Sequence, residues 1–394
     1  MSSCCGAPVV VDMFCGSGGE SQGINWSAEK AGVKIEMFAI NHWERAIETH
    51  RANFPLAEHI CRDVRDIDPS SLMDGRKIAL LWASPACTHF SVARGGKPMD
   101  DQSRVTPFTI LDWLDKLTID RVIIENVPEF CSWGPLDERT CRPIPEAKGD
   151  TFNAFITMIR GLGYAVDWKV LNAADYGAPT TRRRLFIQAV RTGSEKAILW
   201  PEATHTRPET GITLTRGMFP WVPASKIIDW TLPIQIIDER SKPLVANTMK
   251  RICRGIEKYW GEYATPFLVR YNGGRVLPVD VPVPTITTAK GGAIALVEPF
   301  IIDYYGNGTT HTLSDPLPTV TTHDRFALVT PENTSIGFRM LRPSELAAAQ
   351  SFPRSYTFTG NRGEVVKQIG NAVCPKIAEA LTTDYMRELA GVPA

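Results

Sequence analysis

Apolar runs of strand length alternate with amphipathic helical segments over the first half of the chain, and this alternation constrains the fold most. Buried strands are indicated at Pro8–Phe14, Ile35–Ile40, Ile78–Ser84, Arg121–Val127 and Leu185–Val190. Amphipathic stretches lie between them, for example at Glu44–Asn53 and Thr151–Leu162. Strands that alternate with helices form βαβ units around a mostly parallel sheet. We therefore predict an α/β unit with its chemistry at the carboxyl ends of the strands.

The composition is that of an ordinary globular protein. The 394 residues include 43 Lys and Arg and 43 Asp and Glu, and 43% of the chain is hydrophobic. This excludes a disordered chain, a collagen-like fibre and a simple basic DNA-coating protein. It does not exclude DNA binding, because the charge is uneven. Trp168–Arg275 holds 17 Lys and Arg against 9 Asp and Glu, a net charge of +8, so the remainder carries −8.

Nine cysteines occur without a C-x-x-C pair. An odd number without a signal-peptide pattern favours reduced thiols in the cytosol, and the lack of paired ligands argues against structural zinc. No stretch approaches 18 apolar residues, which argues against a membrane span. We therefore expect a cytoplasmic protein without a metal and without a membrane anchor.

The pattern changes near Thr192, where Pro, Thr and Gly become frequent and the strand–helix alternation ends. A weak repeat follows, with PFLVRYNGG at 266–274 and PFIIDYYGNG at 299–308, and we expect two similar β-hairpin units. Helical patterns return at Pro343–Gln350 and from Glu364 onward. The predicted units are 1–191, 192–335 and 336–394.

A basic helical face is indicated within the second unit. Its members are Lys250, Arg251, Arg254 and Lys258. They lie near one side of a helix. The face is either a solvated surface or a site of phosphate contact.

A glycine-rich turn, DMFCGSGG at Asp12–Gly19, follows the first strand directly. Glycines allow a sharp turn and close approach of the backbone to a ligand, of which a nucleotide-like cofactor is one option. The end of the next strand, around His42 and Trp43, is placed to meet the same ligand. Trp43 would stack on an adenine or simply pack in the protein.

Cys87 follows the strand at Ile78–Ser84, and Glu125 lies at the end of the strand at Arg121–Val127. Cys87 is placed like an exposed nucleophile, although many cytosolic cysteines are small buried hydrophobes. Burial of Glu125 would raise its pKa and suit it to proton donation. The alternative is a helix cap or an ion pair.

Arg182 and Arg184 precede or open the strand at Leu185–Val190. In a regular strand they share one face and Arg183 points away. Two arginines on one face would orient an anion or a base. A further Gly-Asn turn, at Gln368–Pro375, stands just before a helix.

Together these motifs resemble those of the DNA cytosine carbon-5 methyltransferase family. The matching segments are Asp12–Gly19, the Cys87 loop, Glu125–Val127, Arg182–Arg184, Arg339–Glu345, Gln350–Pro353 and Gln368–Val373. They span nearly the whole chain in the family's order. The resemblance implies a Rossmann-like methyltransferase sheet in 1–191, an irregular β-rich target-recognition domain in 192–335, and a return segment in 336–394 that completes the catalytic domain.

The resemblance also implies S-adenosylmethionine as the cofactor. Trp43 matches the residue that stacks on adenine, and Asp63 matches the acid that meets the adenine amino group. The last motif packs back against the cofactor. The implied cofactor residues are Asp12, Phe14, Gly16, Gly18, Gly19, His42, Trp43, Asp63, Asn371 and Val373.

For catalysis the resemblance implies that Cys87 adds to carbon 6 of a flipped-out cytosine in double-stranded DNA. Glu125 would hold the proton on ring nitrogen 3, and Arg182 and Arg184 would position the base. The loop Thr88–Met99 is a candidate lid. Candidate DNA contacts are Arg270, Asn272, Lys290, His323 and Arg325. We expect a monomer in a bacterial or phage-infected cell, associated with the nucleoid and with restriction–modification.

The chain departs from the family pattern at several positions. Ala86 and Thr88 flank the cysteine where the family has Pro and Gln, and His42 replaces an acid. Thr180 replaces a Gln and Ser344 an Arg. We interpret the chain as a divergent, active member of a phage or mobile-element type. The alternatives are an RNA cytosine-5 methyltransferase, a DNA-binding relative without catalysis, and transfer of a group other than methyl.

Overall fold

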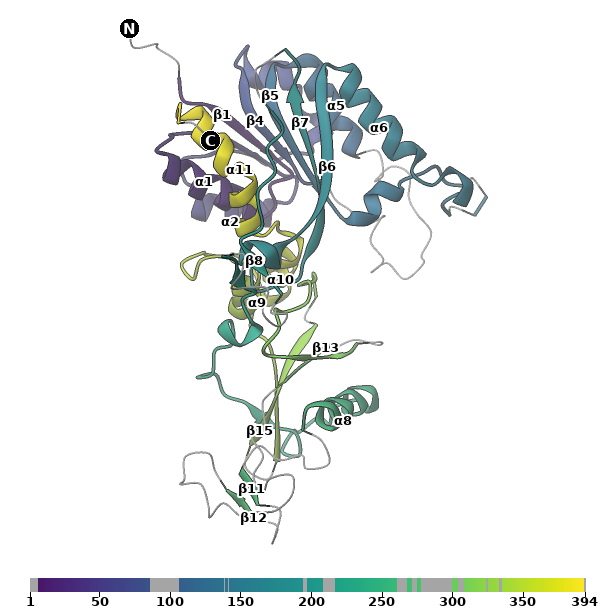
Figure 1. Cartoon of the computed structure of the whole chain (residues 1–394), viewed down its shortest axis with the longest axis vertical. Coiled ribbons are helices and arrows are strands. Elements are labelled where there is room, and N and C mark those ends of the chain that lie inside the picture. Colours follow the sequence, from purple (N-terminus) through teal and green to yellow (C-terminus); the bar gives the residue numbers. More distant parts are fainter. Residues whose placement is uncertain are drawn as a thin grey trace.

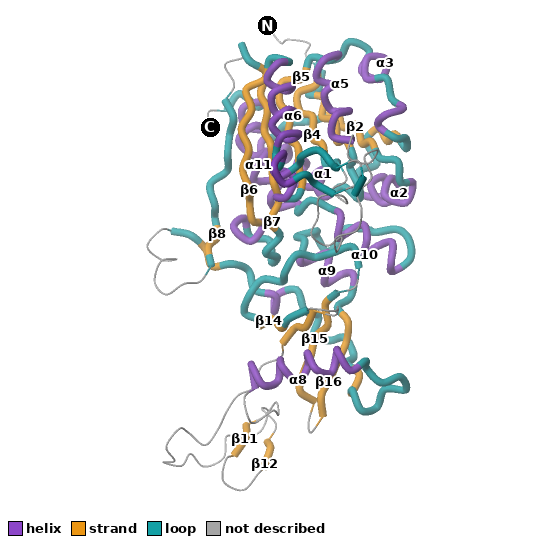
Figure 2. The backbone as a smooth tube through the Cα atoms, turned by 90° about the vertical axis from the view of Figure 1, so that its right-hand side faces the viewer, coloured by secondary structure: helices purple, strands orange, loops and turns teal. Residues whose placement is uncertain are grey.

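The computed structural model describes residues 6–85, 106–137, 139–140, 142–193, 197–207, 217–260, 268–270, 275–277, 300–303, 308–323, 325–332 and 335–392. The molecule is elongated, with a large α/β body at one end and a smaller β-rich unit at the other (Figures 1 and 2). Helices α9 (Pro343–Ala349) and α10 (Arg362–Asn371) lie between the two.

Within the described residues, seven strands form the larger sheet, in the order β3-β2-β1-β4-β5-β7-β6. These are β1 Val9–Met13, β2 Glu36–Ile40, β3 Glu58–Ile60, β4 Ile78–Ala83, β5 Ile119–Asn126, β6 Tyr164–Asn172 and β7 Arg183–Arg191. β1 to β5 are parallel, whereas β7 is antiparallel to β5 and β6. The chain moves outward from β1 to β3 and then returns to place β4 beside β1. The carboxyl ends of β1 and β4 therefore form a switch point, where open α/β sheets bind ligands.

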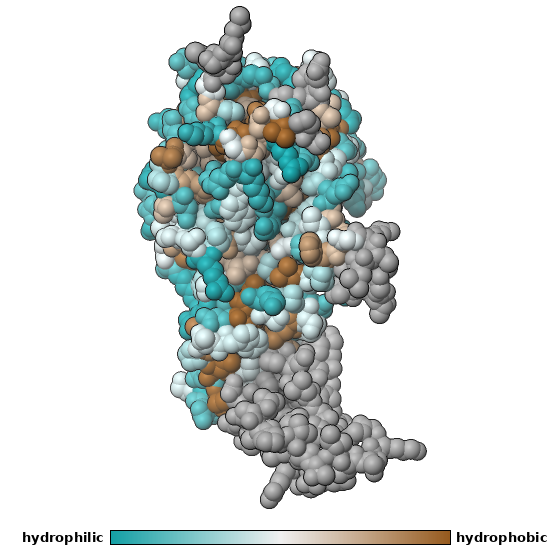
Figure 3. All heavy atoms as spheres, turned by 60° about the vertical axis from the view of Figure 1, so that its left-hand side comes forward, coloured by the Kyte–Doolittle hydropathy of each residue, from teal (hydrophilic) through white to brown (hydrophobic). Residues whose placement is uncertain are grey.

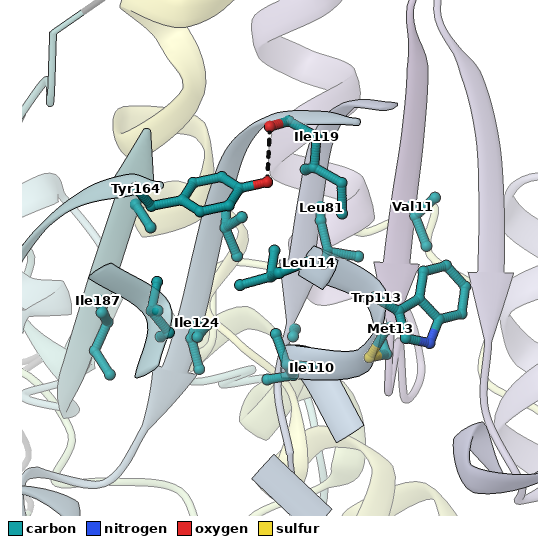
Figure 4. Packing of buried hydrophobic residues seen from close by; sticks show 14 of the residues in the cluster. Val11, Met13, Leu81, Ile110, Trp113, Leu114, Ile119, Ile124, Tyr164 and Ile187 are labelled. Atoms are coloured by element: carbon teal, nitrogen blue, oxygen red, sulfur yellow. Dashed lines mark hydrogen bonds between the residues drawn. The ribbon is translucent and has the colours of Figure 1, made fainter. Parts of the chain in front are cut away.

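Two helical layers cover the larger sheet because its strands are apolar on both faces. The helices are α1 Gly19–Ala31, α2 Glu44–Asn53, α3 Pro69–Met73, α5 Thr109–Lys116, α6 Asp150–Gly161 and α11 Pro375–Leu389. Val11 and Met13 pack in the layer of α5 and α6, whereas Val10 packs in the layer of α1 and α11. In the first layer the Tyr164 hydroxyl donates to the Ile119 carbonyl at 3.0 Å (Figure 4).

The smaller sheet is antiparallel and, among the described residues, has five strands in the order β10-β16-β15-β13-β14. They are β10 Gln235–Ile236, β13 Phe300–Asp303, β14 Thr310–Thr312, β15 Phe326–Glu332 and β16 Ser335–Met340. Helix α8, Ala246–Trp260, packs Ile252 against Phe300 and Ile302 on one face. The other face packs Ile301 and Leu328 in one cluster with residues of α9 and α10. Two short pairs complete the unit: β8 His205–Thr206 with β9 Phe219–Pro220, and β11 Leu268–Arg270 with β12 Arg275–Leu277.

The sequence predictions of secondary structure largely hold. All five expected strands are present, and α2 and α6 match the two expected helices to within one residue. A hairpin begins in each copy of the repeat, β11–β12 in the first and β13–β14 in the second. The unit boundaries at 192 and 335 stay predictions. In the part of the chain that the structure describes, no helix has the length and apolar character needed to cross a membrane.

A prediction concerns the contact between α1 and α11. A Cβ atom at Gly23 would lie 2.4 Å from the Pro375 carbonyl oxygen. Gly23→Ala should therefore lower the free energy of unfolding by about 1–3 kcal/mol, because the backbones must separate. Gly161→Ala is the control, since a Cβ there meets nothing within 4 Å and Ala suits a helix better than Gly. Urea denaturation of both variants measures the difference, and equal stabilities would contradict the prediction.

Candidate active site

The carboxyl ends of the central strands are held together by backbone and side-chain hydrogen bonds. The Ser84 amide donates to the Met13 carbonyl at 3.1 Å, which joins the ends of β4 and β1. The Asn126 side chain donates to the Pro85 carbonyl at 3.4 Å, which joins β5 to the segment after β4. Polar side chains that follow these strands therefore converge at the switch point.

The glycine-rich turn after β1 has a left-handed backbone. Phe14, which is not a glycine, has φ +64°, and Gly16 and Gly18 have φ +50° and +88°. A non-glycine residue in this region is strained and often marks a functional turn. A Cβ at Gly18 would lie within 3 Å of three side chains, and one at Gly19 would lie 2.1 Å from the Val373 carbonyl oxygen. A Cβ at Gly16 would meet only the Phe14 carbonyl oxygen, at 3.9 Å. Gly16 thus leaves room for a ligand, whereas Gly18 and Gly19 serve internal packing.

Trp43 stands half-buried at the end of β2, where it precedes α2. The ammonium group of Lys367, from α10, lies 4.4 Å from the centroid of its ring. This cation–π contact brings the first and last parts of the chain to one edge. His42 beside it is exposed.

Asp63 lies at the same edge, after β3. Both of its carboxylate oxygens accept hydrogen bonds from Arg65, at 3.0 and 2.7 Å. These bonds lower the pKa of Asp63 to about 2, and His42 contributes a smaller effect. Asp63 therefore remains an anion and a hydrogen-bond acceptor.

Glu125 is the buried acid of the site, at the end of β5 and 7% exposed. The Nε atom of Arg184 lies 3.1 Å from its Oε1 atom. Burial raises the pKa of Glu125, and the charges of Arg184 and Arg182 oppose that rise. The sequence predicted a raised pKa for Glu125. The ion pair, which was the alternative interpretation, is also present.

Arg184 lies on β7 and Arg182 just before it. As the sequence predicted, the two lie on one side, and they line a small hollow together with Val373. Arg183 is exposed. The guanidinium group of Arg182 donates to the carbonyls of Val320, at 3.2 Å, and Gly370, at 3.1 Å. Arg182 therefore joins β7 to the region of the smaller sheet and to α10, whereas Arg184 faces Glu125.

The last motif, Gln368–Val373, packs against the glycine-rich turn after β1. Val373 is 2% exposed, and its carbonyl covers Gly19. Asn371, at the end of α10, is exposed. The Ser17 hydroxyl donates to the Gln368 carbonyl at 3.5 Å, and the Tyr356 hydroxyl donates to the Ser17 carbonyl. The turn after β1 is thus held by residues more than 300 positions away.

Asp12 is fully buried beneath this turn and accepts a hydrogen bond from Ser21. Burial raises its pKa to about 7. The sequence did not predict that three residues of this region, Glu20, Ser21 and His50, belong to the site. An acid in the first turn of α1 and a histidine on the buried face of α2 were their only sequence signals.

Several candidates lie outside the described residues, namely Cys87, the loop Thr88–Met99, Asn272 and Lys290. The chain enters that loop from Pro85, which Asn126 contacts next to Glu125. His323 is exposed and Arg325 is partly buried. Within the residues that the structure covers, no three His, Cys, Asp or Glu side chains are grouped as metal ligands.

Comparison with known proteins decides the family. The family model "C-5 cytosine-specific DNA methylase" matches residues 9–387. The chain belongs to this family. It is 27% identical over 388 residues to the type II methyltransferase M1.HphI of Haemophilus parahaemolyticus, covering 97% of this chain and 88% of the relative.

Solved structures show the same fold. A DNMT2 mutant of Spodoptera frugiperda matches with TM-score 0.59 and 16% identity, over 96% of this chain and all of that chain. A putative DNA modification methyltransferase encoded within an Escherichia coli prophage matches with TM-score 0.54 and 18% identity, over 98% and 99% of the two chains. The predicted family, enzyme class and methyltransferase fold are confirmed.

A second prediction concerns Arg182. Arg182→Met would leave the carbonyls of Val320 and Gly370 without this donor, and the expected loss of stability is about 1–3 kcal/mol. Backbone exchange measured by mass spectrometry should rise near residues 317–323 and 366–371. Arg183→Met, on the exposed side of β7, is the control and should change neither region. Unchanged exchange in the Arg182 variant would show that the residue does not join these segments.

Proposed function

We propose that this protein transfers a methyl group from S-adenosylmethionine to carbon 5 of a flipped-out cytosine in a specific duplex DNA sequence. The observation that carries the proposal is the buried Glu125–Arg184 pair at the switch point of the sheet. A carboxyl group with a raised pKa at this place can hold a proton against the base. Family membership supports cytosine as that base.

The described residues fit the cofactor. Gly16 offers backbone with open space beside it, and the half-buried Trp43 ring and the anionic Asp63 lie at the neighbouring strand ends. We assign Phe14 and Gly16 to the methionine part, Trp43 to the adenine ring, and Asp63 to the adenine amino group. When bound, S-adenosylmethionine supplies an electrophilic methyl group. Gly18, Gly19 and Val373 would support the site through packing, and His42 and Asn371 would line its exposed rim.

The chemistry requires a nucleophile and an acid. Cytosine carbon 5 is a weak nucleophile, so the Cys87 thiolate adds to carbon 6. Glu125, whose pKa burial raises, holds a proton against ring nitrogen 3 and stabilises the charge that develops there. Carbon 5 then takes the methyl group and loses its proton, and elimination of the Cys87 thiolate restores the ring. Arg184 orients Glu125, and Arg182 holds the strand from which Arg184 projects.

The smaller sheet is the proposed target-recognition part. Helix α8 buries Ile252 against the sheet and exposes Lys250 and Arg254. Exposed cations on one face of a packed helix fit phosphate contact better than internal pairing. On the face drawn in Figure 3, hydrophilic and hydrophobic residues are interspersed over the described surface. A base within a duplex is inaccessible to Glu125, so the proposal includes base flipping, at an unstacking cost of a few kcal/mol.

The second candidate is an RNA cytosine-5 methyltransferase. The likeness of fold to a DNMT2 protein leaves this alternative open. The bacterial type II relative favours DNA and restriction–modification. A cytoplasmic location near the nucleoid is part of the proposal. We propose that the protein acts as a monomer. Competition between duplex DNA and RNA for the same enzyme separates the two substrates.

Cys87→Ser tests the covalent mechanism. The variant should lose at least about 100-fold in methyl transfer, because a hydroxyl at neutral pH supplies almost no anionic nucleophile. Mass spectrometry of nucleosides from unmodified DNA, incubated with S-adenosylmethionine, measures 5-methyldeoxycytidine. Cys131→Ser is the matched control and should retain wild-type activity. Full methyl transfer by the Cys87 variant would exclude the proposed adduct.

The exposed cations of α8 give a further prediction. Replacement of Lys250 and Arg254 by Ala should reduce the slope of log affinity against log salt concentration by about 2, one unit for each lost phosphate contact. The control variant replaces Lys34 and Lys77, two exposed cations that stand just before β2 and β4 of the larger sheet. Fluorescence anisotropy with duplex DNA at several salt concentrations gives both slopes. Identical slopes would exclude α8 from the DNA interface.

A further inference from the structure

A continuous line of hydrogen bonds runs from the turn after β1 to the protein surface. Ser21 Oγ donates to Asp12, and His50 Nε2 lies 2.9 Å from Ser21 Oγ. His50 Nδ1 lies 2.9 Å from His59 Nε2. The first three side chains are fully buried, whereas His59, on β3, is partly exposed. The line therefore connects a buried carboxyl group to solvent.

The inner end of this line lies at the proposed active site. Glu20 is 2% exposed, and its carboxyl group is close enough to both Asp12 and Glu125 for the charges to interact. Burial, and then the charge of Asp12, raise the pKa of Glu20 well above its usual value. Burial raises that of Asp12 to about 7. Burial therefore favours the protonated form of both carboxyl groups.

The middle of the line is held in one orientation. The His50 ring packs against Phe54, with ring centroids 4.6 Å apart, and a Cβ at Gly18 would come within 2.9 Å of it. Glycine at position 18 thus makes the room that His50 occupies. Burial, and then the charge of His59, lower the pKa of His50 to about 3, so the ring is neutral and carries one N–H.

His59 forms the outer end of the line. Burial, and then the charge of Arg51, lower the pKa of His59, and the backbone of Ala57 opposes that shift. At the inner end, the charges of Asp12 and Glu20 also act on Cys15 and Tyr356. The charge of Glu125 acts on Glu20.

The directions of these hydrogen bonds allow two arrangements. With Asp12 ionised, Ser21 donates to Asp12, His50 Nε2–H donates to Ser21, and a cationic His59 donates to His50. With Asp12 protonated, each donor direction between Asp12 and His59 is reversed, and His59 is neutral. The two arrangements differ by one proton moved from Asp12 to His59. Each intermediate group gains one proton and loses another.

We propose that Ser21, His50 and His59 form a proton relay that carries the proton lost from cytosine carbon 5 out of the active site. This inference rests on the proposed function. Methylation by a sulfonium donor releases one proton for each methyl group transferred. The C5–H electron pair forms the C5–C6 double bond and expels the Cys87 thiolate. The proton passes through pocket water to the Glu20–Asp12 pair, and His59 releases an equivalent proton to solvent.

The test separates methyl transfer from proton loss in a single turnover. DNA with tritium at carbon 5 of cytosine is mixed with excess enzyme and methyl-labelled S-adenosylmethionine, and both labels are followed. His59→Ala should attach methyl groups to DNA at the wild-type rate but release tritium about 10-fold more slowly, within the range of a single general acid–base group. Free imidazole in the buffer should restore most of that rate, because it replaces the missing ring. His50→Gln keeps hydrogen-bonding atoms but cannot pass a proton, and it should slow tritium release without rescue.

Glu58→Ala, an exposed neighbour of His59 on β3, is the control and should behave as wild type. A His59 variant with normal tritium release would overturn the relay. So would equal slowing of methyl transfer and proton loss without rescue by imidazole, because that result indicates a structural role. If the wild-type protein itself produced no 5-methyldeoxycytidine, the proposed function would fail and the relay's role with it.

Discussion

The contact between α1 and α11 is the constraint on which the rest of the molecule depends. Gly19 and Gly23 let α1 approach the backbone of Val373 and Pro375 more closely than any side chain would allow. The first and last segments of the chain thereby form one layer over the larger sheet. The smaller sheet is inserted between them in sequence, so its ends are anchored to the same body. Arg182 reinforces this anchor with its bonds to Val320 and Gly370.

Burial sets the chemical state of each carboxyl group around the switch point. Glu125, Asp12 and Glu20 are enclosed, and burial is the largest cause of the raised pKa in all three. Asp63 is more exposed and bound by Arg65, so its pKa falls. One edge of the sheet therefore combines carboxyl groups whose pKa is raised with one whose pKa is lowered. A site that must hold one proton on a base and dispose of another needs both kinds.

The sequence predicted the central strands because they are apolar runs bounded by turn residues. It missed β3, which is three residues long and begins Glu58-His59, and β6, whose Tyr164–Asn172 segment alternates polar and apolar residues. Both are edge strands of the sheet. The antiparallel direction of β7 has no local signal. In the site, strand periodicity placed Arg182 and Arg184 on one face. The different partners of these two residues, and the contacts among Asp12, Ser21 and His50, depend on tertiary packing that no short motif encodes.

Three departures from the family pattern, His42, Thr180 and Ser344, lie within the described residues. Thr180 is fully buried, in the segment between β6 and β7. Its hydroxyl donates to the Pro318 carbonyl at 3.1 Å, in the segment that follows β14 of the smaller sheet. A compact β-branched residue suits this junction, where its backbone also forms a bridge with Leu317. Ser344 and His42 are exposed. Thr180 therefore lies at the junction with the smaller sheet's region and the other two lie on the surface, while the ion pair between buried Glu125 and Arg184 is formed within the larger sheet.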